Sequence, residues 1–136
     1  EYIASTLPRH LGKTADGHVI VAHLGSGASM CALKAGCSVA TSMGFTALDG
    51  LMMGRRCGTL DAGVVLYLMQ EKGMTAEEVT ALLYRQSGLL GVSGISNDLA
   101  VLEASNDRQA QEAIDLFCYR AARELAALAT GMGGLD

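Results

Sequence analysis

The sequence predicts one mixed α/β domain, in which a short meander of strands comes first and helices then cover it. Three observations predict this order. Residues 18–24 are rich enough in apolar and β-branched side chains for a buried strand, two more short strand-like runs follow them, and helix signals dominate the chain after residue 61. With 136 residues, half of them apolar, the chain can bury the core of one ordinary domain.

One helix and three strands are expected in the first half of the chain. Apolar residues fit one helical face over 2–11, which Gly12 ends although Pro8 lies inside it. The strands are predicted at 18–24, 29–34 and 38–42, with Ala35-Gly36 as a hairpin connection. Residues 45–58 form a long irregular segment, of the kind that is usually ordered for a function.

Helices are expected in the second half. They are predicted over 61–72, from Thr75 to about Ser87, in a short helix through Leu102, and from Asp107 to about Thr130. Thr75 and Glu78 form a capping box, and 88–94 reads as a glycine-punctuated connection. The last helix has an apolar stripe predicted to face the core: Ala110, Ile114, Phe117, Ala121, Leu125 and Leu128.

Composition argues against several classes of function. A net charge of −4, scattered Lys and Arg, two Phe and four Tyr offer nucleic acid neither a basic stripe nor stacking platforms. The longest apolar runs fall far short of the roughly 20 residues of a membrane span, so we expect a soluble protein with no membrane partner. The four cysteines lack any paired spacing, which predicts free thiols in the cytoplasm and no metal site.

The clearest chemical signal is the turn after the first strand, His23-Leu24-Gly25-Ser26-Gly27. Closely spaced glycines let consecutive N–H groups face an anion such as a nucleotide phosphate. The alternative is a hairpin turn with no further role. A second candidate, Leu11-Gly12-Lys13-Thr14, ends like a Walker A loop but fails, because Leu7 stands where the first glycine is required and the segment precedes a strand.

Four segments together resemble the acetate kinase family, which moves a phosphoryl group between ATP and a short-chain carboxylate. They are 21–25 (VAHLG), 41–46 (TSMGFT), 50–54 (GLMMG) and 91–98 (GVSGISND). The resemblance implies an actin-like ATPase (ribonuclease H-like) fold, with 1–136 as part of a C-terminal nucleotide-binding domain. The start at Glu1 without Met or leader, and the glycine-rich end, likewise predict a piece of a longer protein. The resemblance implies that the missing parts are the N-terminal domain and the end of the C-terminal domain. The whole family protein is expected to be a homodimer.

The resemblance also implies roles for individual residues. His23, Leu24, Gly25, Ser26 and Gly27 match the phosphate-binding turn, in which Ser26 replaces the usual Asn and keeps only a hydroxyl donor. The segment Asp98-Leu99-Ala100 matches the part that reaches adenosine, and Ala100 stands where the family commonly has Arg. Asp98 would accept from the ribose hydroxyls; it is equally suited to capping the following helix.

Arg56 matches the family's transition-state arginine. A planar guanidinium can meet two equatorial oxygens of a transferring phosphoryl group, whereas an isolated loop arginine is usually solvated or paired. We expect His23 to orient the turn by hydrogen bonding, since a carboxylate nucleophile has no proton to lose. Four other groups are expected to serve packing, structure or the solvated surface: Met52-Met53, Cys57, Arg55, and the histidines His10 and His18.

The function expected from the sequence is therefore ATP-dependent acetate or propionate kinase activity, with ATP and ADP as substrates and Mg²⁺ held outside this segment. The family's carboxylate-binding arginine, acidic catalytic residue and Mg²⁺ ligands match no position here, so the segment alone is expected to be inactive. Two alternatives stay open. One is a non-catalytic nucleotide-binding or scaffold module, and the other is a structural domain whose glycine turns serve only hairpin geometry.

Overall fold

The computed structural model describes residues 2–136, and its centre is a three-stranded antiparallel sheet. β1 (His18–Leu24), β2 (Ala28–Lys34) and β3 (Cys37–Thr41) lie in the order β1-β2-β3. Leu24 pairs with Ala28, so residues 25–27 alone turn the chain between β1 and β2. The predicted meander is confirmed, with β2 and β3 each beginning one residue earlier than expected.

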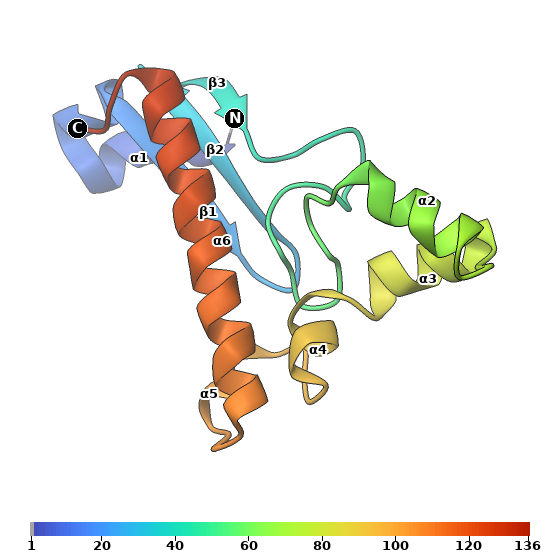
Figure 1. Cartoon of the computed structure of the whole chain (residues 1–136). Coiled ribbons are helices and arrows are strands. Elements are labelled where there is room, and N and C mark those ends of the chain that lie inside the picture. The colour runs from blue at the N-terminus through green and yellow to red at the C-terminus, as the bar shows by residue number, and fades with distance from the viewer. Residues whose placement is uncertain (1) are drawn as a thin grey trace.

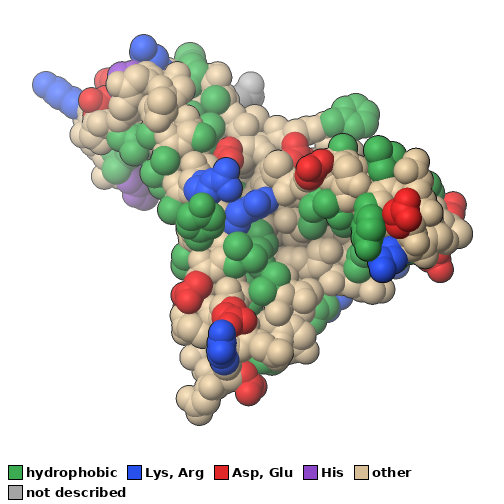
Figure 2. Space-filling view, in the orientation of Figure 1, with side chains coloured by type: hydrophobic (Ala, Val, Ile, Leu, Met, Phe, Trp, Pro, Cys, Tyr) green, Lys and Arg blue, Asp and Glu red, His purple; other side chains and the backbone are tan. Residues whose placement is uncertain are grey.

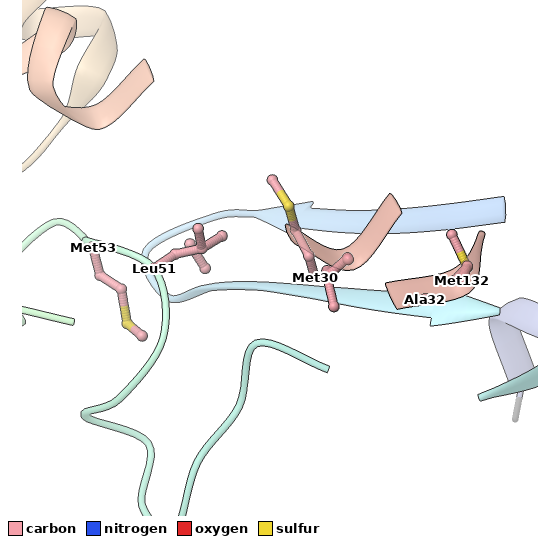
Figure 3. Packing of buried hydrophobic residues seen from close by; sticks show 7 residues of the cluster. Met30, Ala32, Leu51, Met53 and Met132 are labelled. Atoms are coloured by element: carbon pink, nitrogen blue, oxygen red, sulfur yellow. The ribbon is translucent and has the colours of Figure 1, made fainter. Parts of the chain in front are cut away.

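One long helix, α6 (Arg108–Met132), lies across one face of the sheet (Figure 1). Alternate residues of β2 point to the same face, and Met30 and Ala32 are both buried there. Leu51 and Met53 of the irregular segment and Met132 of α6 complete this core (Figure 3). The expectation that Met52-Met53 belongs to the core is confirmed, and the irregular segment is thereby anchored between sheet and helix.

The apolar stripe of α6 is confirmed at Ala110, Phe117 and Leu128, which are buried, and wrong at Leu125, which is 40% exposed. A helix of 3.6 residues per turn places Leu125 roughly 80° from Phe117 and roughly 60° from Leu128 around the helix axis. It therefore lies at the edge of the contact with the sheet. Burial of the central residues, rather than of the whole stripe, holds α6 in place.

The other helices lie toward the two ends of the view, α1 beside the sheet on the left and α2 and α3 on the right beyond the irregular segment (Figure 1). α1 (Tyr2–Leu11) and the 3₁₀ helix η1 (Gly12–Asp16) precede β1, while α2 (Ala62–Gln70) and α3 (Ala76–Arg85) follow the irregular segment. The capping box is confirmed: the Glu78 N–H donates to Thr75 Oγ1 over 3.2 Å, and the Thr75 N–H donates to Glu78 Oε2 over 2.8 Å. The helices predicted over 61–72 and from Thr75 to about Ser87 are thus present.

The prediction of an irregular connection over 88–94 is wrong, because this segment contains the helix α4 (Gly88–Ser93). Glycine disfavours helix, but Leu89 is 3% exposed and packs with Phe117 of α6. Tertiary packing therefore outweighs local propensity here. The next short helix, α5 (Leu99–Glu103), was expected and is present, with Asp98 as its N-cap.

His18 was expected at the surface, and its ring is instead half-buried against the far end of the chain. The His18 N–H donates to Oδ2 of Asp136 over 2.8 Å, and ring Nδ1 lies 3.0 Å from the same oxygen. Gly133 and Gly134, both with positive φ, turn the chain back from α6 toward β1. The hydrogen bonds from the backbone and ring of His18 lower the pKa of the Asp136 carboxyl.

This contact makes part of the stability depend on pH. Because the folded pKa of Asp136 lies below its ordinary 3.8, the contact stabilises the fold above that value and is lost as pH falls through the lowered pKa. We expect Asp136→Asn to reduce the free energy of unfolding at neutral pH and to reduce it much less at a pH below the lowered pKa of Asp136. Urea unfolding of both proteins at the two pH values measures this, and an equal difference at both would contradict it.

Candidate functional site

The turn between β1 and β2 is held by its own backbone. The Gly25 N–H donates to the carbonyl of Gly27 over 2.9 Å. A Cβ built on Gly25 would lie 3.2 Å from Nε2 of His23, so the imidazole lies against this glycine. The turn itself, including Ser26, is exposed to solvent except for the partly buried Gly27. The sequence therefore presents a short exposed turn with a histidine at its base.

Arg56 lies on one side of this turn. Its Nη1 donates to the carbonyl of Ala47 over 3.0 Å and lies 3.7 Å from the sulfur of Met53. A Cβ built on Gly27 would lie 3.9 Å from the same nitrogen. The guanidinium and the glycine turn are therefore neighbours, and a methyl group at position 27 would be in ordinary van der Waals contact with Arg56.

A pocket of about 280 Å³ lies beside the same turn. Its lining brings the turn next to the segment before α5, and consists of Leu24, Gly25, Ser26, Gly54, Leu89, Asn97, Asp98, Leu99 and Phe117. The Ala100 N–H donates to Oδ1 of Asp98 over 2.9 Å, so Asp98 caps the following helix. Its other carboxylate oxygen, Oδ2, does not take part in this cap. Ala100 is exposed and does not line this pocket.

The acetokinase family model matches residues 1–136. The chain belongs to this family. It is 66% identical over 137 residues to acetate kinase of Rhodopseudomonas palustris (strain TIE-1), a match that covers the whole chain and 34% of that protein. It is 60% identical to acetate kinase of Methylocella silvestris over 136 residues, with the same coverage. The chain thus spans about a third of the length of these relatives.

Solved structures of kinases resemble this acetokinase segment over almost its whole length. Porphyromonas gingivalis acetate kinase superposes with a TM-score of 0.93 at 38% identity, covering 98% of this chain and 35% of that one. A propionate kinase from Francisella tularensis gives 0.90 at 38% identity, covering 99% and 35%. Acetate kinases have the actin-like ATPase fold, so the predicted fold class is confirmed.

The start of α4 holds the irregular segment around Arg56 in place, and sequence reasoning missed this contact. The Ser87 N–H donates to the carbonyl of Arg55 over 3.0 Å, and the Leu89 N–H donates to that of Met53 over 2.9 Å. A Cβ built on Gly88 would overlap the carbonyl oxygen of Met53. Backbone donors leave no signature in a sequence, and the only available signal was the glycine itself.

The remaining groups near the site have structural surroundings. Arg55 donates from Nη2 to Oδ1 of Asn97 over 3.3 Å and so joins the loop to the segment before α5. Burial raises the pKa of the Cys57 thiol, while its own backbone and the charge of Arg120 oppose that rise. The thiol stays protonated near neutral pH, and all four cysteines of the described residues are free.

Two further features concern metals and membranes. Residues 2–136 contain no group of three or more His, Cys, Asp or Glu side chains placed to hold a metal ion. Within the same range, no helix combines the length and the apolar character that crossing a membrane requires.

Proposed function

We propose that this chain belongs to an enzyme that transfers the γ-phosphoryl group of ATP reversibly to acetate or propionate, giving an acyl phosphate and ADP. The observation that carries the proposal is the position of the Arg56 guanidinium beside the Gly25–Gly27 turn. The names of the relatives, acetate kinase and propionate kinase, support the substrate class.

The proposed roles belong to the turn itself, to Arg56 beside it and to the pocket that the turn lines. The backbone N–H groups of the turn, apart from that of Gly25, which bonds within the turn, bind nucleotide phosphates, Ser26 adds a hydroxyl donor, and His23 orients the turn. Arg56 offers two parallel donors to the equatorial oxygens of the transferring group, where negative charge is spread in the transition state. At the pocket, Asp98 and Leu99 meet the nucleoside together with Leu24, and Ala100, outside the pocket lining, only continues this segment.

Several parts of this proposal lie beyond the chain. Mg²⁺, when bound with the nucleotide, neutralises phosphate charge, and we place its ligands outside residues 1–136. We assign the chain to the C-terminal nucleotide-binding domain of a cytoplasmic homodimer. Because the carboxylate-binding arginine and the acidic catalytic residue find no match here, the isolated chain is proposed to be inactive.

A chimera tests the function directly. In it, this chain replaces the matching 137 residues of the R. palustris acetate kinase, whose unmodified form is the control. Formation of acetyl phosphate from ATP and acetate by the chimera, and none by the isolated chain, is the expected result. A chimera that binds ATP without transfer would instead support a non-catalytic binding module, and one that binds no ATP would support a purely structural role.

A further inference from the structure

The irregular segment that carries Arg56 is closed at its base by Thr59. The Thr59 N–H donates to the carbonyl of Gly50 over 2.9 Å, and its hydroxyl donates to Oδ1 of Asp49 over 2.8 Å. In return, the Gly50 N–H donates to Thr59 Oγ1 over 3.3 Å. Residues 51–58 therefore form a loop whose two ends, at Asp49-Gly50 and Thr59, are hydrogen-bonded to each other; these residues are called the base of the loop.

Arg120 of α6 ties this base to the long helix. Its Nη2 donates to the carbonyl of Thr59 over 2.6 Å, across 61 positions of sequence. Hydrogen bonds from a charged donor are shorter and stronger than those between neutral groups. The Arg120 side chain is half-buried and lines a hollow of about 160 Å³ together with Gly50 and Leu51. Figure 2 shows basic side chains gathered over α6 on this face.

The loop between its base and Arg56 has little freedom to absorb a shift. A Cβ built on Gly58 would lie 2.6 Å from the carbonyl oxygens of both Gly50 and Leu51, so the two arms of the loop touch. Leu51 and Met53 are 2% and 4% exposed and packed in the core beneath α6. The Met53 N–H also donates to the carbonyl of Arg56 over 3.2 Å. A displacement of the base is therefore passed on to Arg56.

We propose that Arg120 is a positioning residue for Arg56. By holding the Thr59 carbonyl, it fixes the base of the loop relative to α6 and the sheet, and so keeps the Arg56 guanidinium beside the 25–27 turn. The inference rests on the proposed function, because it assigns Arg120 to the same phosphoryl transfer. Arg120 itself bonds to the loop backbone and acts only through it.

The first test measures the contact itself in the 136-residue chain. Amide hydrogen exchange of Met53 and Thr59 is expected to accelerate about tenfold or more in Arg120→Ala, with β1 and β2 unaffected. Arg123→Ala is the matched control, since Arg123 lies on the same helix and lines the same hollow as Arg120, but its guanidinium lies over the ring of Tyr119, 5.8 Å from the centroid, instead of bonding to Thr59. Unchanged exchange in Arg120→Ala would overturn the proposal, as would equal acceleration in both variants.

The second test measures the consequence in the chimera. A misplacement of about 1 Å can cost about 100-fold in rate, so Arg120→Ala is expected to lower kcat by about 10- to 100-fold and to change the KM for ATP less than about threefold. Arg120→Lys, which keeps a charged donor, should recover part of kcat, and Arg123→Ala should behave as the parent chimera. A rise in KM at unchanged kcat would contradict positioning.

A second substitution at the same position covers the case in which Arg120→Ala does not fold. Arg120→Met keeps an unbranched apolar stem but removes the donor to the Thr59 carbonyl, and the same exchange pattern and fall in kcat are expected. Normal kcat and exchange in Arg120→Met would overturn the proposal. If the parent chimera is inactive, the proposed function fails, whereas the exchange measurement still decides whether Arg120 holds the loop.

Discussion

Arg56→Ala is expected to lower kcat for acetyl phosphate formation by about 1,000-fold or more in the chimera, and to change the KM for ATP by less than about fivefold. The reason is that charge develops on the transferring phosphoryl group only in the transition state, so an arginine that meets it there stabilises that state selectively. Steady-state kinetics with ATP and acetate measure both constants.

Arg55→Ala provides the neighbouring control. Its Nη2 bonds to Asn97, which lines the pocket beside the turn, and not to the turn itself, so a fall in kcat of less than about tenfold is expected. Both variants should melt at the temperature of the parent chimera, since neither arginine belongs to the buried core. Added guanidinium ion should restore part of the rate of Arg56→Ala alone. A rate for Arg56→Ala within about tenfold of the parent would contradict the proposed role.

The strands and most helices were predictable because local patterns specify them. Residues 18–24 are rich in apolar and β-branched side chains, and Thr75 and Glu78 stand at the spacing of a capping box, so strand and helix start were each encoded within a few residues. The glycine turn was likewise predictable as a turn. Its proximity to Arg56 followed only from the resemblance, since no periodicity relates positions 27 and 56.

The features that sequence reasoning missed depend on contacts between distant residues. His18 meets Asp136 across 118 positions, and Arg120 meets Thr59 across 61. A histidine at a strand start and an arginine on a helix have the same appearance whether solvated or paired. Similarly, α4 forms because Leu89 is buried against α6, whereas the neighbouring glycines by themselves predict an irregular segment.

Gly88→Ala is expected to lower the free energy of unfolding by about 3 kcal/mol, more than a glycine-to-alanine substitution elsewhere in α4. Two costs add at this position. Its φ of +64° is unfavourable for alanine, and the new Cβ would overlap the Met53 carbonyl and lie 2.8 Å from that of Arg56. Both carbonyls belong to buried or partly buried backbone, so neither can move away cheaply.

Gly94→Ala separates these two costs. Gly94 ends the same helix with a φ of +65°, yet a Cβ there would meet nothing within 4 Å. Gly94→Ala should therefore lower the free energy of unfolding only by the cost of the unfavourable φ, about 1 kcal/mol. Urea unfolding of the chain and its two variants gives the difference, which measures how closely α4 approaches the Arg56 loop. Equal losses in both variants would mean that the loop yields to the added methyl group, and that α4 does not hold Arg56 in place.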